Sequence, residues 1–146
     1  MVFVMNPSVK LQFPNLSEKN YSETSPISRH YNCIAWAAGD DRHFWWPQYA
    51  YWPTGLSSEL TVDNFMAAFQ TLGYEACDGP ELEPGFEKIA IYTKMGAPTH
   101  AARQLSNGYW TSKLGRNIDI EHHSLEAIEG PAYGKAFAYM KRPTSS

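Results

Sequence analysis

The stretch THAARQLSNGYWTSKL, residues 99–114, predicts two antiparallel strands joined by a tight turn. Asn107-Gly108 is a strong hairpin signal, because glycine readily adopts the left-handed backbone conformation that such turns require. Two registers fit the sequence. A three-residue loop, Ser106-Asn107-Gly108, places His100 and Ser112 on one face of the sheet as diagonal neighbours. A two-residue Asn-Gly turn instead places Ser112 on the opposite face.

Segments on either side of this hairpin show the periods of helices and strands. A helix is predicted between Thr61 and Gly73, because apolar residues recur there with helical spacing and Thr61 suits the N-cap position. The sequence further predicts strands at 74–78, 88–94 and 135–142 and short helices at 32–38 and 123–129. Helices that precede an antiparallel sheet are typical of an α+β domain, which is the predicted fold class.

The 146 residues suit one domain with one main core. Residues 1–30 contain Pro7, Pro14 and Pro26 and show little periodicity. They are therefore interpreted as an extended N-terminal arm that packs on the domain. Residues 31–146 are expected to form the single domain.

Charge and composition exclude several classes of partner. A net charge of −3, with scattered basic residues, provides no basis for binding nucleic acid or an anionic membrane. No apolar run approaches the roughly 20 residues of a membrane span, and the opening MVFVMNPSVKL is interrupted too early for a signal peptide. We therefore expect a reduced cytoplasmic protein, or one exported by a system that needs no signal peptide. No cofactor is expected.

The stretch YNCIAWAAG, residues 31–39, places Cys33 just inside a predicted helix whose N-cap is Asn32. A helix N-terminus and a nearby protonated histidine are two features that lower the pKa of a thiol and make it nucleophilic. Among the five histidines His100 is favoured as the partner, because it begins a strand of the predicted hairpin. Cys77 has no such surroundings and is interpreted as a packing residue.

Three local patterns together resemble one family. YNCIAWA is similar to the start of a catalytic helix, and KIAIYTK followed by THAARQLSNGYWTS is similar to a strand and a histidine-bearing hairpin. Tyr21 lies twelve residues before Cys33, with Ser25-Pro26 between them. These patterns resemble the papain-like cysteine peptidases, in particular the NlpC-type branch that cleaves bacterial cell-wall peptides.

The resemblance implies a papain-like fold with Cys33 as nucleophile and His100 as general base. It also implies that Tyr21 and the backbone N–H of Cys33 stabilise the oxyanion, and it places Ser112 at the position that orients the histidine. Gln104 and Asp119 are alternatives to Ser112 in that role. The expected function is a thiol-dependent hydrolase of an amide bond, acting as a peptidase, amidase, deamidase or acyl transferase. Its substrate would be a peptide or protein, and a bacterial effector delivered by a secretion system fits the lack of a signal peptide.

The alternative hypothesis is a catalytically inactive papain-like module that binds partners through the aromatic loop at residues 44–52. This loop, within FWWPQYAYWP, is expected mainly to pack on the domain, because many exposed aromatic rings would be unfavourable in water. Trp45 and Trp52 are the candidates to line a substrate cleft. The pair His122-His123 beside Glu121 raises the possibility of a metal site. No metal site is predicted, because adjacent strand residues point to opposite faces and the chain lacks HxxxH and CxxC spacings.

Overall fold

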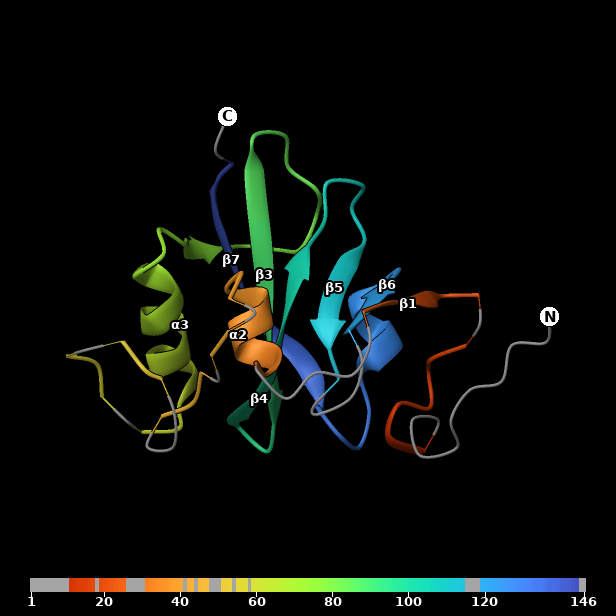
Figure 1. Cartoon of the computed structure of the whole chain (residues 1–146), viewed down its shortest axis with the longest axis horizontal. Coiled ribbons are helices and arrows are strands. Elements are labelled where there is room, and N and C mark those ends of the chain that lie inside the picture. The colour runs from red at the N-terminus through yellow and green to blue at the C-terminus, as the bar shows by residue number, and fades with distance from the viewer. Residues whose placement is uncertain are drawn as a thin grey trace.

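The computed structural model describes residues 11–17, 19–25, 31–40, 42–43, 45–47, 51–53, 55–57, 59–114 and 119–144. Seven strands form one antiparallel sheet, in the order β1-β6-β5-β4-β3-β7-β2 (Figure 1). They are β1 (Tyr21–Ser25), β2 (Glu75–Cys77), β3 (Phe86–Lys94), β4 (Ala97–Gln104), β5 (Trp110–Lys113), β6 (Asp119–His122) and β7 (Lys135–Pro143). The helices are α2 (Cys33–Ala37), α3 (Val62–Gln70) and the 3-10 helix η1 (Leu125–Ile128).

The predicted α+β fold class, with a papain-like arrangement of N-terminal helices on a small sheet, is wrong. In the described part of the chain the protein is β-rich, with two short α-helices and 17% of the described residues helical. Two strands were missing from the prediction, because β1 and β6 are short and carry no apolar alternation. They become strands by pairing with each other, from Tyr21 opposite His122 to Ser25 opposite Asp119.

The central hairpin has the three-residue loop. The N–H of Leu105 donates to the carbonyl of Tyr109 at 2.7 Å, and Arg103 lies opposite Thr111. Gly108 takes a φ of 90°, which a residue with a side chain adopts only with strain. This register places His100 and Ser112 on one face of the sheet.

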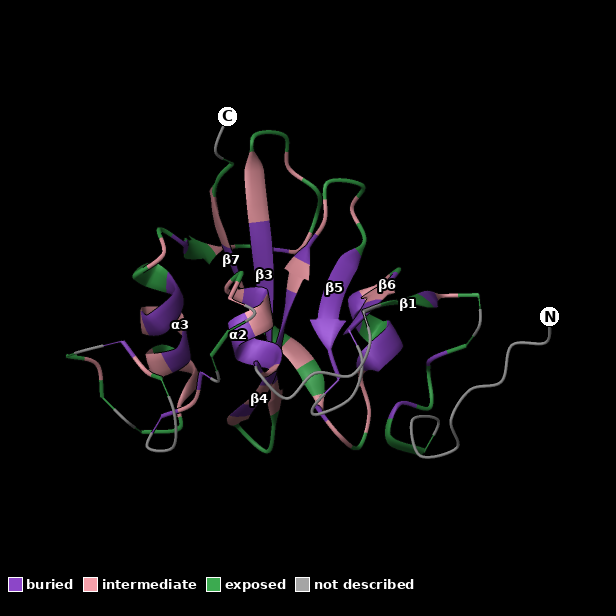
Figure 2. Ribbon diagram, in the orientation of Figure 1, coloured by how far each residue is buried: buried purple, intermediate pink, exposed green. Residues whose placement is uncertain are grey.

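Both faces of the sheet are covered. One face, here called the helix face, packs against α2, which lies in front of the sheet in Figure 1, and against α3, which lies beside it. Its core residues are Ile34, Phe65, Phe69, Ile89, Ile91, Ala101 and Met140. The opposite face, here called the η1 face, packs against η1 and an N-terminal segment, with core residues that include Phe13, Leu16, Tyr92, Ala102, Trp110, Ile120, Leu125 and Tyr133. Figure 2 shows that the buried positions concentrate in the central strands.

The segment interpreted as an arm contributes to both the sheet and the core. Residues 21–25 form the edge strand β1, and Phe13 and Leu16 are buried on the η1 face. Residues 1–10 and 26–30 lie outside the described part of the chain. In the described part no helix is long and apolar enough to cross a membrane.

The aromatic loop packs on the helix face where the structure describes it. Trp45 is 5% exposed, and its indole N–H donates to Asp40 Oδ2 at 2.9 Å. Trp46 and Trp52 both contact the ring of Phe65. The packing interpretation therefore holds for these three residues.

Candidate active site at the start of α2

Asn32 holds the first turn of α2 and the aromatic loop together. Its side-chain oxygen accepts from the N–H of Ala35 at 3.1 Å and from the N–H of Trp45 at 2.9 Å. Its side-chain amide donates to the carbonyl of Trp45 at 2.8 Å. Because the N-cap prediction is correct, Cys33 is the first residue of the helix, as expected.

The thiol of Cys33 is packed between α2 and the sheet. Cys33 is 7% exposed and belongs to the core of the helix face, together with Ala101 of β4. Burial raises the pKa of the thiol to about 11, although a hydrogen bond with the backbone of Ala101 and the charge of Lys113 act in the opposite direction. At neutral pH the resting thiol is therefore protonated.

The structure does not bring Cys33 and His100 together. Side chains alternate along β4, and because Ala101 faces α2, His100 points to the η1 face. There the imidazole stacks on the ring of Tyr133, with centroids 4.0 Å apart. Tyr21 also lies in the core of the η1 face, away from the thiol. The sheet thus separates Cys33 from the base and the oxyanion donor that the resemblance implies.

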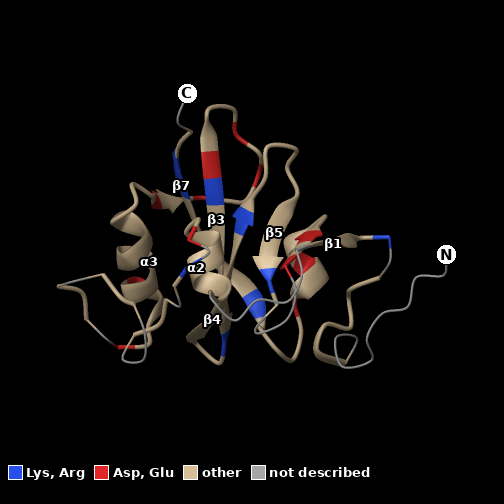
Figure 3. Ribbon diagram, viewed as in Figure 1, with Lys and Arg blue, Asp and Glu red and all other residues tan. Residues whose placement is uncertain are grey.

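Two charged residues lie on the side of Cys33 instead. Lys113 and Asp119 are directly opposite each other on β5 and β6, and both are fully buried. In Figure 3 the basic end of β5 corresponds to Lys113. Burial lowers the pKa of the Lys113 ammonium, and the charges of Asp119 and Cys33 partly offset that effect.

Tyr31 completes this group from the chain just before α2. Its hydroxyl donates a short hydrogen bond to Asp119 Oδ2, and the Lys113 Nζ lies 5.0 Å from the centre of its ring. The other oxygen, Asp119 Oδ1, is buried and has no hydrogen-bond partner among the residues that the structure describes. We call Tyr31, Cys33, Lys113 and Asp119 the α2 cluster.

The α2 cluster is difficult to explain by stability alone. Removing an ammonium and a carboxylate from water costs free energy that their mutual attraction often fails to recover. Buried ionisable groups with shifted pKa values are instead typical of functional sites. The cluster is therefore the candidate active site.

A second polar chain crosses the interior of the η1 face. His100 Nε2 lies 3.0 Å from Ser112 Oγ, which lies 2.8 Å from His122 Nε2. His122 Nδ1 lies 2.8 Å from the carbonyl oxygen of Ser124. Burial holds the pKa of His122 near 4 and the pKa of His100 well below its usual range, so both rings are neutral at pH 7.

These contacts allow only one arrangement of protons. The Ser124 carbonyl can only accept a hydrogen bond, so His122 carries its proton on Nδ1. Its Nε2 is therefore unprotonated and can accept. The Ser112 hydroxyl therefore donates to His122 Nε2, and His100 Nε2–H donates to Ser112 Oγ. His100 Nδ1 is then a buried acceptor without a donor among the described residues. The predicted link between His100 and Ser112 is thus present, but it continues to His122 and not to Cys33.

One family model matches this chain, over residues 22–141, and it is described as a domain of unknown function, DUF7689. The chain belongs to this family. No curated protein and no solved structure matches the chain. The match contains all members of the α2 cluster as well as His100, Ser112 and His122, so both polar groups lie inside the DUF7689 domain.

Of the remaining sequence candidates, none joins the α2 cluster except Asp119. Gln104 is on the same face as His100, and its amide donates to the carbonyl of Pro80 at 2.9 Å. Trp45 is buried, and the indole N–H of Trp52 donates to the carbonyl of Ser57 at 3.0 Å. Asp119, considered as a partner for His100, contacts Tyr31 instead.

Sequence reasoning missed Tyr31 and Lys113, and it considered His122 only as a metal ligand. A signal for Lys113 was available, because alternation in WTSK places it on the face opposite Ser112. Because the sequence predicts no metal site, it predicts no role for His122. Among the described residues no group of three or more His, Cys, Asp or Glu side chains gathers as a metal site would require.

Proposed function

We propose that this DUF7689 domain is a thiol-dependent enzyme that cleaves an amide bond, with Cys33 as nucleophile and Lys113 as the group that accepts its proton. One observation carries the proposal: Lys113 and Asp119 are buried opposite each other on the face of the sheet that α2 covers, where both contact Tyr31, two residues before Cys33. The pairing of Cys33 with Lys113 replaces the Cys33–His100 pair, whose members lie on opposite faces of the sheet.

The pKa of Cys33 is raised and that of Lys113 is lowered. These shifts favour a mechanism in which the thiol loses its proton as it attacks, and they disfavour a thiolate that exists before the substrate binds. Burial raises the pKa of the Cys33 thiol to about 11, so a general base must take the proton as the sulfur attacks. Burial lowers the pKa of Lys113, which increases the fraction of the neutral amine that can serve as that base. Lysine fills this role in some serine-based active sites.

The proposed reaction has two halves. In the first, the Cys33 thiol transfers its proton to the amine of Lys113 while the sulfur bonds to the acyl carbon, and the new ammonium then protonates the leaving amine as the C–N bond breaks. In the second, water attacks the thioester, releasing the carboxylic acid and restoring the thiol. Asp119 lies opposite Lys113 and stabilises the ammonium that forms between these steps.

The natural substrate proposed for this site is a peptide or protein amide, but the test needs only a small acyl donor. The purified domain is mixed with p-nitrophenyl acetate, and release of nitrophenolate is followed together with the intact mass of the protein. A Cys77→Ala background removes the second thiol, which is only half-buried. We expect a burst of nitrophenolate and one acetyl group on Cys33, both lost in Cys33→Ala.

Lys113→Arg separates the proposed chemical role from a structural one. Arginine keeps a cation opposite Asp119, but its pKa above about 12 prevents it from accepting a proton. We expect folded Lys113→Arg to acylate at least about tenfold more slowly than the parent. His100→Asn is the matched control on the opposite face, and its acylation rate should equal that of the parent.

Two results would overturn the proposal. In the first, Lys113→Arg acylates Cys33 as fast as the parent protein. In the second, a correctly folded His100→Asn variant fails to acylate, which would restore histidine as the base and require a different arrangement of α2 and β4.

A further inference from the structure

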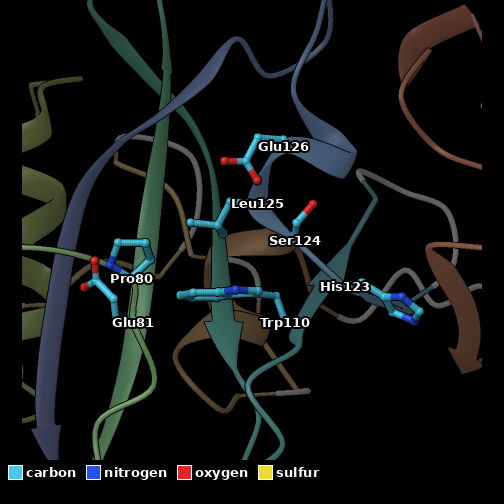
Figure 4. Close-up of a pocket in the computed structure, with 7 residues that line it drawn as sticks. All are labelled: Pro80, Glu81, Trp110, His123, Ser124, Leu125 and Glu126. Carbon is cyan, nitrogen blue, oxygen red and sulfur yellow. The ribbon is translucent and has the colours of Figure 1, made fainter.

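We propose that a pocket beside Trp110 binds a small organic cation, an ammonium or guanidinium group that also carries a carbonyl oxygen. The pocket has a volume of about 230 Å³ and opens on the η1 face. It is lined by Pro80, Glu81, Trp110, His123, Ser124, Leu125 and Glu126, which come from the loop before β3, from β5, from the β6–η1 connection and from η1 (Figure 4).

The first observation is an unused hydrogen-bond donor in the pocket wall. Trp110 is 3% exposed, and its ring lies beneath Leu125 in Figure 4. No residue in the described part of the chain accepts from its indole N–H, yet that nitrogen is not among the atoms sealed from solvent. The indole N–H of this otherwise buried side chain is therefore free to donate to an acceptor atom of a ligand in the pocket.

The second observation is the charge that surrounds this donor. Glu81 and Glu126 bring carboxylates to the same pocket from separate segments, and neither forms an ion pair with a described residue. Burial raises the pKa of the nearby Tyr139 hydroxyl, and the charges of Glu126, Glu129 and Glu81 act in the same direction. The pocket wall contains no lysine or arginine. Its potential therefore favours a cation.

The apolar residues of the pocket wall indicate the chemistry of the uncharged part of the ligand. Pro80, Leu125 and the Trp110 ring provide apolar contacts for a short aliphatic chain. The volume admits a molecule no larger than an amino acid or the side chain of one peptide residue. An arginine or lysine unit meets all three requirements: a cation for the carboxylates, methylenes for the walls and a carbonyl oxygen for the indole N–H.

This site is independent of the proposed thiol chemistry. Trp110 and Leu125 belong to the core of the η1 face, whereas Cys33 belongs to the core of the helix face. A negative result for one proposal therefore does not contradict the other. Cys33→Ala should bind the cation with the affinity of the parent.

The experiment compares two ligands of nearly the same shape. Nα-Acetyl-L-argininamide (here called argininamide) is titrated into the ¹⁵N-labelled protein, and Nα-acetyl-L-citrullinamide (here called citrullinamide), which has a neutral urea in place of the guanidinium and no charged α-amine, is titrated in parallel. The readout is the indole N–H resonance of Trp110, identified by its loss in Trp110→Phe. The resonances of the other four tryptophans serve as internal controls. We expect argininamide to shift the Trp110 resonance and citrullinamide to bind at least about tenfold more weakly.

Variants with matched charge changes locate the cation. Glu81→Gln and Glu126→Gln, each made alone, should each weaken argininamide binding severalfold. Glu59→Gln removes the same kind of charge from an exposed residue outside the pocket, and it should leave the affinity unchanged. Equal binding of the two ligands, equal weakening by Glu59→Gln, or no shift of the Trp110 resonance would each overturn the proposal.

Discussion

Ser112 connects the two buried histidines of the η1 face. Its hydroxyl accepts from His100 Nε2–H and donates to His122 Nε2, at 3.0 and 2.8 Å. The side chain is fully buried, so water cannot replace either contact without entering the core. At the residue scale, the polar interior of this face therefore depends on one hydroxyl group.

Ser112→Ala should destabilise the protein, because it leaves two buried ring nitrogens without partners. The expected loss in the free energy of unfolding is about 2 kcal/mol, measured by urea denaturation. Ser106→Ala, in the exposed loop of the same hairpin, is the matched control and should change the stability by less than about 0.5 kcal/mol. Equal stability of the two variants would contradict the hydrogen-bonded chain.

The same histidines predict how stability changes with pH. The pKa of His122 is lowered to about 4 in the folded protein, whereas a histidine in the unfolded chain titrates near about 6.5. In acid the unfolded state therefore binds more protons, and stability falls as the pH decreases from about 6.5 toward 4. Burial lowers the pKa of His100 as well, so its effect has the same sign.

The loss attributable to His122 alone is roughly 3 kcal/mol between pH 7 and pH 4. Urea unfolding measured across this range should show a clearly smaller loss for His122→Gln. Ser106→Ala, at an exposed residue that does not titrate, should retain the slope of the parent. A parent slope that His122→Gln leaves unchanged would show that His122 is not buried in its neutral form.

At the scale of elements, one turn approaches the sheet closely where β7 begins. Gly130 and Gly134 exchange two backbone hydrogen bonds, of 3.0 and 2.8 Å, just before the strand. A Cβ atom built on Gly134 would lie 2.0 Å from the carbonyl oxygen of Thr93, and Gly134 has a φ of +75°. Only glycine fits this position.

Gly134→Ala should therefore cost roughly 3 kcal/mol or more, because the turn must move away from β3. Gly96→Ala is the matched control, since Gly96 has a similar φ of +83° but open space around its Cβ position. The control should lose only about 1 kcal/mol, from backbone strain alone. Urea denaturation of both variants measures the difference, and equal losses would show that the contact with Thr93 is not tight.

At the scale of the whole molecule, the central strands of the sheet are paired on both sides, whereas the edge strands are paired on one side only. β3 pairs with both β4 and β7 over almost its full length. β1 lies at one edge of the sheet, and β2 lies at the other with only three residues. We expect the slowest amide hydrogen exchange in β3, with rates in β1 and β2 at least about tenfold faster. Protection of β1 equal to that of β3 would contradict the topology.

Much of the local structure could be predicted from particular residues. Asn32 and Thr61 were identified as N-caps, and the structure shows both side chains accepting from the third residue of their helices. Asn107-Gly108 indicates the hairpin. Of the two registers that fit the sequence, the structure has the one with the three-residue loop. β1 and β6 could not be predicted, because polar segments such as YSETS become strands only when a partner is present.

The helix ends, the hairpin and the presence of Cys33 at a helix start follow from the amino-acid sequence, because these features depend on residues close together in the chain. The tertiary structure alone decided which face of β4 the helix α2 covers. His100 and Ala101 are both buried, so alternation along the strand cannot tell which of them meets α2. That choice placed Lys113 and Asp119 beside Cys33 and left His100 with Ser112 and His122, because a strand sends neighbouring side chains to opposite faces of a sheet.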